Sequence, residues 1–470
     1  MTMWNPDLAR RSGPRYLAIA EAIAADVRAG RLRSGERLPT HRDLAYRLGV
    51  TVGTVTRAYA EAERRGLIAG EVGRGTFVQD LRSASPAFPT MDSAPVREAP
   101  AVDESGPVDL SVNYPVREAT DRTLGDTLRA LAGEPGIATL LDYQLNRGLL
   151  RHREAGVKLI RRGGLETTPD RVIVTCGAQH AMTVAFAALA RPGDVVLTEA
   201  LTYPGMKLIA GMMQLRLHGV AMDEQGLLPD AFEAACRTMQ PKALYCMPTL
   251  HNPTAVTMPE ARRREIARIA EAHGVAIVED DIYGFLDPAA PPPLSHFAPS
   301  VGHYVLSVSK CLAPGLRAGF LSLPPGDAST YIAAVRSTVW MAPPLAVEIA
   351  ARWIQGGTGD QLSAKLTDDA TGRQRLVQER LAGFDYVTAP HSLHGWLTLP
   401  EPWRASHFAA EARSRGVLVT PAEAFVVARP APQAIRICVG TVRRREGLLR
   451  GLDTLVTLLR SKPEEHLSIM

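Results

Sequence analysis

The chain has 470 residues, of which 46% are hydrophobic and 22% are charged, a composition that fits a folded protein of two or three domains and excludes a disordered or fibrous one. Its net charge of +4 is carried by residues 1–80, which hold 13 Arg and nine acidic side chains, so this end of the chain favours a polyanionic partner. No apolar run is long enough to span a membrane, no secretion signal is found at the start, and the five Cys lack the spacing of a metal site, so we expect a cytoplasmic protein with no membrane partner and no bound metal.

Residues 14–79 have the pattern of three helices followed by a hairpin. Apolar residues recur at helical spacing from residue 14 onward, and Gly30 ends this helix. Two further helices are expected over residues 41–48 and 52–66, and the stretch LIAGEVGRGTFV predicts a two-stranded hairpin. This order indicates a winged helix–turn–helix DNA-binding domain over residues 1–80. A three-helix adaptor that binds other proteins is the alternative.

The second of the paired helices is expected to reach the major groove, and the hairpin tip is expected to approach the minor groove. Hydroxyl groups and Arg side chains near helix starts can contact phosphates or base edges. The predicted DNA-binding residues are Arg42 on the first helix of the pair, Thr51, Gly53, Thr54 and Arg57 on the second, and Arg74, Gly75 and Thr76 at the hairpin tip.

Three blocks of this module occur in a fixed order, namely GRLRSGERLPTHRDLA, LGVTVGTVTRAY and GRGTFV. They resemble the winged helix–turn–helix of the GntR family. The resemblance implies that Arg42, Thr51, Thr54 and Arg74 bind an operator in double-stranded DNA. Family members often carry Arg or another polar residue after the first Thr of the recognition helix, whereas this chain has Val52.

Residues 81–108 are rich in Pro, Ser and Ala without apolar periodicity, so we interpret them as a linker. From residue 109 to residue 470, short β-rich runs such as RVIVTC alternate with amphipathic helices. This alternation predicts an α/β fold with a mostly parallel sheet covered by helices on both faces. The last part, from about residue 330 to residue 470, mixes helices and short strands and predicts a smaller α+β lobe.

Polar residues gather where the predicted strands end, which is the edge at which open α/β sheets bind ligands. A lysine, a carboxylate, an arginine and a helix N-terminus are the groups that pyridoxal 5′-phosphate (PLP) requires for its aldehyde, its pyridine nitrogen and its phosphate. The candidates are Lys310, Ser307, Arg317, Gly177, Ala178, Gln179, Asp280, Tyr283, Asn252 and Tyr203. Taken singly, each of them has an ordinary structural alternative, such as a helix cap or a packed turn residue.

The ordered motifs GAQ, TYPG, NPT, EDDIY and SVSKCLAPGLRAG resemble fold-type I aminotransferases from about residue 109 to the C-terminus. The resemblance implies that Lys310 forms the Schiff base with PLP. The other implied roles are phosphate binding by Ser307, Arg317 and the amides around Ala178 and Gln179, pairing of Asp280 with the pyridinium, contact of Asn252 and Tyr283 with the ring hydroxyl, and stacking of Tyr203 on the ring.

Two further roles follow from the same resemblance. Arg436, in AIRICV, matches the arginine that binds a substrate carboxylate, and Tyr143 matches the tyrosine that reaches the cofactor phosphate of a partner subunit. The second match implies a homodimer. This chain departs from the family at Ala255, where NPT is usually followed by Gly. His251, before Asn252, is expected to face solvent, and contact with a ligand is the alternative.

A GntR-like reader joined by a linker to an aminotransferase-like body resembles the MocR subfamily of transcriptional regulators. That resemblance implies a PLP-dependent regulator whose effector, a small amino compound, forms an external aldimine with the cofactor and alters operator binding. An active aminotransferase with an appended DNA-binding domain is the alternative, since the same lysine serves both functions. A scaffold that has lost its cofactor is disfavoured by the number of cofactor-binding candidates.

Overall fold

The computed structural model of the chain describes residues 4, 6, 14–28, 31–32, 36–64, 67–71, 75–78, 106–115, 120–427 and 430–461. The chain divides into two compact units, residues 1–90 and residues 91–470. Most of the predicted linker and the predicted contact Arg74 lie outside the described residues. No helix within the described ranges is long and apolar enough to cross a membrane.

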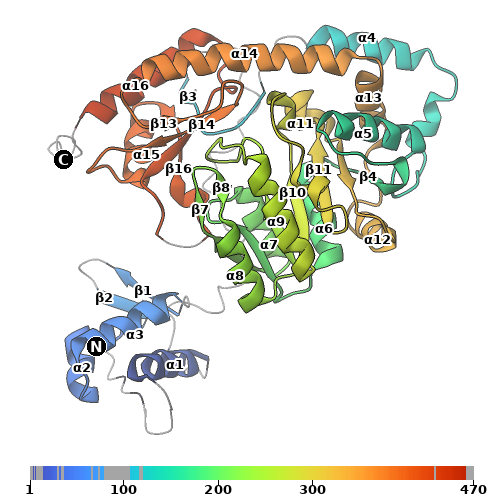
Figure 1. Ribbon diagram of the computed structural model, residues 1–470. Helices are drawn as coiled ribbons and strands as arrows, with labels where there is room; N and C mark the ends of the chain where they lie inside the picture. The colour runs from blue at the N-terminus through green and yellow to red at the C-terminus, as the bar shows by residue number, and fades with distance from the viewer. Residues whose placement is uncertain are drawn as a thin grey trace. The chain divides into compact units, whose positions relative to one another are not determined.

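The first unit contains the elements expected of its sequence: α1 (Arg15–Arg28), α2 (His41–Leu48), α3 (Val52–Arg64), β1 (Ile68–Glu71) and β2 (Gly75–Val78). Thr40 caps α2 by accepting a hydrogen bond from the Asp43 backbone N–H, and Gly49 ends the helix at φ 61°, a backbone angle that favours glycine. Strands β1 and β2 pair antiparallel, with Ile68 opposite Val78. Figure 1 shows the three helices and the hairpin, and their buried apolar side chains form one core.

The second unit is built on a sheet of seven strands among the described residues, in the order β4-β12-β11-β10-β9-β5-β6. Strand β12 runs antiparallel to both of its neighbours, and the other pairs are parallel. The mostly parallel sheet predicted from the sequence is therefore confirmed. The strands are β4 (Val172–Thr175), β5 (Val195–Glu199), β6 (Arg216–Val220), β9 (Ala243–Cys246), β10 (Ala276–Asp280), β11 (Gly302–Ser307) and β12 (Gly319–Ser322).

Both faces of this sheet are buried under helices. Successive side chains of a strand point to opposite faces, so each strand contributes to two apolar cores. In β11, Val305 packs in one apolar core, while Tyr304 and Leu306 pack in another. The surrounding helices are α4 (Thr120–Ala132), α5 (Leu150–Arg162), α6 (Ala178–Leu189), α7 (Pro204–Met212), α8 (Pro229–Met239), α9 (Glu260–His273), α10 (Leu294–Phe297), α11 (Val308–Cys311), α12 (Ser329–Thr338) and α13 (Pro344–Gln355). The remaining short elements are β7 (Met222–Asp223), β8 (Gly226–Leu227) and the 3-10 turns Ile137–Leu141, Pro169–Arg171, Gly284–Leu286 and Pro314–Leu316.

A smaller antiparallel sheet forms the C-terminal lobe, in the order β13-β14-β17-β16. Figure 1 shows α14 (Thr358–Arg380) running as one long helix over this lobe and the larger sheet. The segment that follows the linker also joins the lobe, since β3 (Val108–Asp109) pairs in parallel with β15 (Val417–Leu418). The other elements are β13 (Tyr386–Val387), β14 (His394–Thr398), α15 (Ala405–Ser414), β16 (Thr420–Pro421), a 3-10 turn (Ala422–Ala424), β17 (Ala434–Cys438) and α16 (Arg445–Arg460).

Candidate functional site

Lys310 lies on the short helix α11, which follows directly from β11. Its Nζ donates a hydrogen bond to the backbone carbonyl of Asn113 and lies 5.9 Å from the centre of the Tyr114 ring. Burial lowers the pKa of Lys310 to about 8. A lowered pKa raises the fraction of neutral amine near pH 7, and the neutral amine is the form that attacks an aldehyde.

Asp280 is the last residue of β10 and is completely buried. Its Oδ2 accepts a hydrogen bond of 3.0 Å from the hydroxyl of Tyr245, whereas its Oδ1 has no hydrogen-bond partner among the described residues. Burial raises the pKa of Asp280 to about 7. An unpartnered buried carboxylate oxygen calls for a donor, and the protonated pyridine nitrogen of PLP is such a donor.

The predicted phosphate site lies at the N-terminus of α6, where Gly177 is the N-cap at φ 83°. The first N–H groups of a helix have no partner within that helix and attract anions. Arg317 lies beside them, since its Nη2 donates to the Cys176 carbonyl at 3.1 Å and a Cβ on Gly177 would come within 2.8 Å of that nitrogen. Ser307 instead caps α11, accepting from the Ser309 backbone N–H, so its hydroxyl is already engaged.

Three predicted ring contacts are also near these strand ends. The Tyr283 hydroxyl is buried and accepts a hydrogen bond of 2.9 Å from Asn113 Nδ2. Tyr203 is half-buried at the start of α7, and its hydroxyl donates to Gln179 Oε1 at 3.4 Å. Asn252 is buried and accepts from Arg436, as described next.

Arg436 lies on β17, in the C-terminal lobe, and reaches the strand ends of the larger sheet. Its Nη1 donates to Asn252 Oδ1 at 2.8 Å, and its Nη2 donates to the Ser111 carbonyl at 2.5 Å. Its Nε has no hydrogen-bond partner within the described part of the chain. A planar guanidinium with a free donor is suited to bind a carboxylate.

Sequence reasoning missed three side chains of this cluster. Asn113 and His394 are buried and joined by a hydrogen bond of 2.9 Å, and Tyr245 holds Asp280. Tyr245 had a detectable signal, because a tyrosine within a strand that is buried on both faces needs a partner for its hydroxyl. Asn113 gave no signal, because its role depends on the path of the chain after the linker.

The loop before α9 departs from one expectation and has an unusual backbone conformation. His251 is buried rather than facing solvent, with its Nε2 3.0 Å from the Leu201 carbonyl and its Nδ1 2.8 Å from Thr254 Oγ1. The prediction of a solvent-facing histidine was wrong, because the loop folds back on the sheet. Ala255 adopts φ 60°, a left-handed conformation that glycine takes at less cost.

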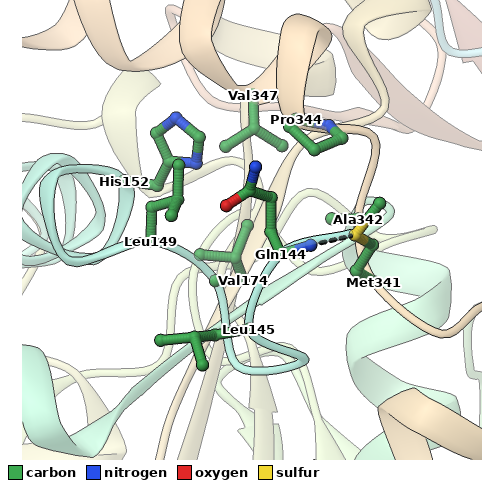
Figure 2. Close-up of a pocket in the computed structure, with 10 residues that line it drawn as sticks. Gln144, Leu145, Leu149, His152, Val174, Met341, Ala342, Pro344 and Val347 are labelled. Carbon is green, nitrogen blue, oxygen red and sulfur yellow. Dashed lines mark hydrogen bonds between the residues drawn. The ribbon is translucent and has the colours of Figure 1, made fainter. Parts of the chain in front are cut away.

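Tyr143 lies apart from the Lys310 cluster and is 83% exposed. Its ring centre is 5.7 Å from that of Trp340, which is also exposed. Figure 2 shows a small cavity beside this region, lined by Leu145, His152 and Met341 among others. None of the residues predicted to hold the cofactor lines this cavity.

In the first unit, the predicted DNA-contacting residues Arg42, Thr51, Gly53 and Arg57 are exposed, and Thr54, Gly75 and Thr76 are half-buried. Thr51 caps α3 by accepting from the Thr54 backbone N–H, and the two hydroxyl oxygens are 2.9 Å apart. The hydroxyl of Tyr59 on α3 donates to the Pro39 carbonyl just before α2, at 2.8 Å. This bond fixes the two helices of the pair against each other.

The two units match two family models. Residues 105–452 match the model for aminotransferase class I and II, and residues 15–78 match the model for bacterial regulatory proteins of the gntR family. The body thus has the fold of the PLP-dependent aminotransferases of class I and II, and PLP is its cofactor. The protein is a transcriptional regulator with a GntR-type DNA-binding domain and an aminotransferase-like body.

Two regulators align with this chain over most of their length. The uncharacterized HTH-type transcriptional regulator YdeF of Bacillus subtilis (strain 168) is 30% identical over 457 residues, which cover 97% of this chain and 96% of YdeF. The HTH-type transcriptional regulator TauR of Rhodobacter capsulatus is 27% identical over 447 residues, covering 87% and 88%. The chain belongs to the MocR subfamily of GntR regulators.

Solved aminotransferases share the fold of the body. The multiple substrate aminotransferase of Thermococcus profundus aligns with a TM-score of 0.71 and 23% identity, covering 81% of this chain and 98% of that enzyme. An archaeal alanine:glyoxylate aminotransferase aligns with a TM-score of 0.70 and 23% identity, covering 76% and 91%. The fold class predicted from the sequence is therefore confirmed.

Asp280 makes the stability of the cofactor-free protein depend on pH. Because its folded-state pKa is raised to about 7, its ionisation opposes folding as the pH rises from about 4 to about 7. We expect the free energy of unfolding of the wild type to fall relative to that of Asp280→Asn over this range, by up to about 1.4 kcal/mol per pH unit. Urea unfolding of both proteins at pH 5, 6, 7 and 8 measures the difference, and parallel pH profiles would contradict it.

Proposed function

We propose that this protein is a PLP-dependent transcriptional regulator whose effector is a primary amine with a carboxylate. When bound, PLP supplies an aldehyde that bonds reversibly to an amine, so the effector amine can replace that of Lys310. Arg436 binds the effector carboxylate. The effector binds one conformation of the body more tightly than another and thereby shifts operator affinity.

One observation carries this proposal: a complete cofactor cluster lies in a chain that begins with a DNA-binding domain. Lys310 has a buried amine of lowered pKa that donates to the Asn113 carbonyl. Asp280 Oδ1 and the Nε–H of Arg436 have no hydrogen-bond partner among the described residues. These three groups meet the needs of the aldehyde, the pyridinium and a carboxylate. A purely structural body would have no need for a set of unpartnered buried groups, which are costly to maintain.

The test uses the full-length protein loaded with PLP and a DNA duplex that it selects from a random library. Each of the twenty proteinogenic L-amino acids is titrated while the cofactor absorbance and the anisotropy of the labelled duplex are recorded. We expect at least one of them to shift both signals with the same midpoint. Shifts in cofactor absorbance with unchanged DNA affinity for every amino acid would refute the proposal.

An active aminotransferase is the second candidate, favoured by the same intact cluster of Lys310, Asp280 and Arg436. Transamination requires Lys310 to move a proton between the amine carbon and the cofactor, in addition to releasing the amine. Accumulation of keto acid in the titration distinguishes the two. Sustained turnover with unchanged DNA affinity supports the enzyme, and saturable binding with little turnover supports the regulator.

We also propose that the protein works as a homodimer. An exposed group of apolar side chains on the body consists of Leu141, Tyr143, Leu145, Trp340 and Leu345. Exposed apolar groups of this kind mark protein–protein interfaces, and the resemblance to fold-type I enzymes implies a role for Tyr143 at the partner's cofactor. Sedimentation of the wild type and of Tyr143→Asp tests the proposal. We expect a dimer for the wild type and a weakened dimer for the variant, and a monomeric wild type would contradict the proposal.

The recognition helix permits a prediction about the operator. Val52, the first residue of α3, is 44% exposed, and a Cβ on Gly53 would meet no atom closer than 3.9 Å. Methyl groups in the major groove contact the C5-methyl of thymine. We therefore expect Val52 to contact a thymine in each half-site.

Replacing that thymine by uracil in one half-site removes one methyl group. We expect the wild type to bind the uracil duplex roughly fourfold more weakly, the equivalent of about 0.8 kcal/mol for one buried methyl. Val52→Ala should bind both duplexes equally, whereas Arg42→Ala should weaken both while keeping the preference. Anisotropy titrations provide the affinities, and a Val52→Ala protein that still prefers thymine would rule out this contact.

A further inference from the structure

The post-linker segment, residues 108–115, connects the linker to the body and passes through the candidate site. Its first residues pair with β15, since the backbone N–H groups of Val108 and Leu110 donate to the carbonyls of Gly416 and Leu418 at 2.8 Å. The end of the segment that joins the linker is therefore paired with the C-terminal lobe, and its other end lies at the candidate site. Any shift of the segment reaches the linker directly.

Two backbone carbonyls of this segment accept hydrogen bonds from the two cationic groups of the site. The Ser111 carbonyl accepts from Arg436 Nη2, and the Asn113 carbonyl accepts from Lys310 Nζ. Both cations are the groups that an amino-acid effector engages under the proposed function. The segment and the effector therefore use the same two hydrogen-bond donors, Arg436 and Lys310.

The side chain of Asn113 adds a third connection. Its Nδ2 donates to the Tyr283 hydroxyl and to His394 Nδ1, each at 2.9 Å, while its Oδ1 has no partner among the described residues. His394 Nε2 in turn lies 3.0 Å from the His251 carbonyl, the residue before Asn252. One asparagine thus joins the post-linker segment, the C-terminal lobe and the loop that carries Asn252.

The segment is held on its other side by residues that are outside the cofactor cluster. Thr420 Oγ1 donates to the Ser111 carbonyl at 3.0 Å, and Thr441 Oγ1 donates to the Val112 carbonyl. A Cβ on Gly440 would lie 1.8 Å from the Tyr114 carbonyl oxygen. Because the segment is closely packed here, it cannot shift without breaking its hydrogen bonds to Thr420 and Thr441.

We propose that residues 110–114 sense the state of the site and transmit it to the linker. The inference rests on the proposed function. Bonding to the cofactor would leave the Lys310 nitrogen at most one N–H, whereas the released amine has at least two, so an effector amine that takes the place of Lys310 would free it to donate to the Asn113 carbonyl. The effector carboxylate takes Arg436 Nη2 away from the Ser111 carbonyl. Effector binding therefore tightens one point of the segment and loosens another.

The first experiment is amide hydrogen exchange on the full-length, PLP-loaded dimer or monomer as purified. The probes are methylamine, which has only the amine, propionate, which has only the carboxylate, and the amino acid that shifts the cofactor absorbance most. A single hydrogen bond is worth about 1 kcal/mol, or roughly fivefold in a local opening equilibrium. The amides of Leu110 and Cys438 form hydrogen bonds across this segment. We expect the amino acid to change the exchange rate of at least one of them by at least about fivefold. Methylamine and propionate should each produce a smaller change in that rate.

The second experiment uses Thr420→Val and Thr441→Val, which keep the side-chain volume and remove one bond to the segment each. Thr454→Val, on the exposed face of α16, removes an equivalent helical bond to the Arg450 carbonyl and serves as the control. We expect effector affinity, followed by cofactor absorbance, to change less than about threefold in all three proteins. The ratio of operator affinities with and without the amino acid should fall towards 1 only in the first two.

The outcomes separate this inference from the proposed function. If the amino acid changes operator affinity in the wild type, but exchange in the segment is unchanged and both Thr variants keep the full response, transmission by residues 110–114 is refuted while the regulator stands. If no amino acid that shifts the cofactor absorbance changes operator affinity, the proposed function and this inference fail together.

Discussion

Lys310→Ala is expected to lose the response of operator binding to the effector while keeping operator affinity within about threefold of the wild type. The predicted DNA-contacting residues lie in the first unit, which has its own core, so we expect loss of one lysine from the body to leave them intact. Without Lys310, the protein has no lysine amine at this position with which the effector amine can exchange. We expect the amino acid to produce no change in DNA anisotropy at concentrations that saturate the wild type. This result corresponds to a loss of more than about 100-fold in apparent effector affinity, or about 2.7 kcal/mol.

The matched control is Lys158→Ala. Lys158 lies on α5, and its Nζ donates to the Gln355 carbonyl at 2.9 Å, so it carries the same charge but contacts none of the cofactor candidates. It should keep the full response. A Lys310→Ala protein that responds like Lys158→Ala would mean that the amine exchange is not the switch.

Arg436→Leu is expected to weaken binding of carboxylate-bearing effectors on the order of 100-fold. Arg436 offers charged donors in a buried setting, and a hydrogen bond to a charged group contributes about 1.5–3 kcal/mol. Methylamine lacks the carboxylate, so its affinity should be unchanged within about threefold. Cofactor absorbance measures both affinities.

Arg436→Lys separates charge from geometry, because lysine keeps the charge but cannot make two parallel hydrogen bonds to a carboxylate. We expect its effector affinity to lie between those of the wild type and Arg436→Leu. Equal loss for methylamine and for amino acids in either variant would show that the site itself had collapsed. In that case Arg436 would be structural rather than a carboxylate-binding residue.

The elements that sequence reasoning identified best are those in which local pattern and burial agree. One example is the strand Val172–Thr175 with the helix that begins at Ala178. Both are expected from the period of their apolar residues and from the glycine between them. The residues at such junctions, including Lys310 and Asp280, are found together because parallel strands end at one edge. Arg436 came only from a family resemblance, since it lies on a strand of another sheet.

The remaining parts of the site depend on long-range folding. Asn113 contacts Tyr283 and His394, residues 170 and 281 positions further along the chain. No local pattern specifies such contacts, because they arise from how the post-linker segment is placed between two lobes. His251 was misjudged for a related reason, since its burial depends on the return of its loop to the Leu201 carbonyl.

The antiparallel strand β12 has a consequence for how the site tolerates change. Because β12 returns alongside β11, with Ser307 opposite Gly319, the connection between them is a closed loop that carries both Lys310 and Arg317. The chain length of this loop sets the separation between the amine and the guanidinium. An insertion or deletion in this connection would change that separation. We therefore expect this connection to set the spacing between the predicted contacts for the aldehyde and for the phosphate of the cofactor.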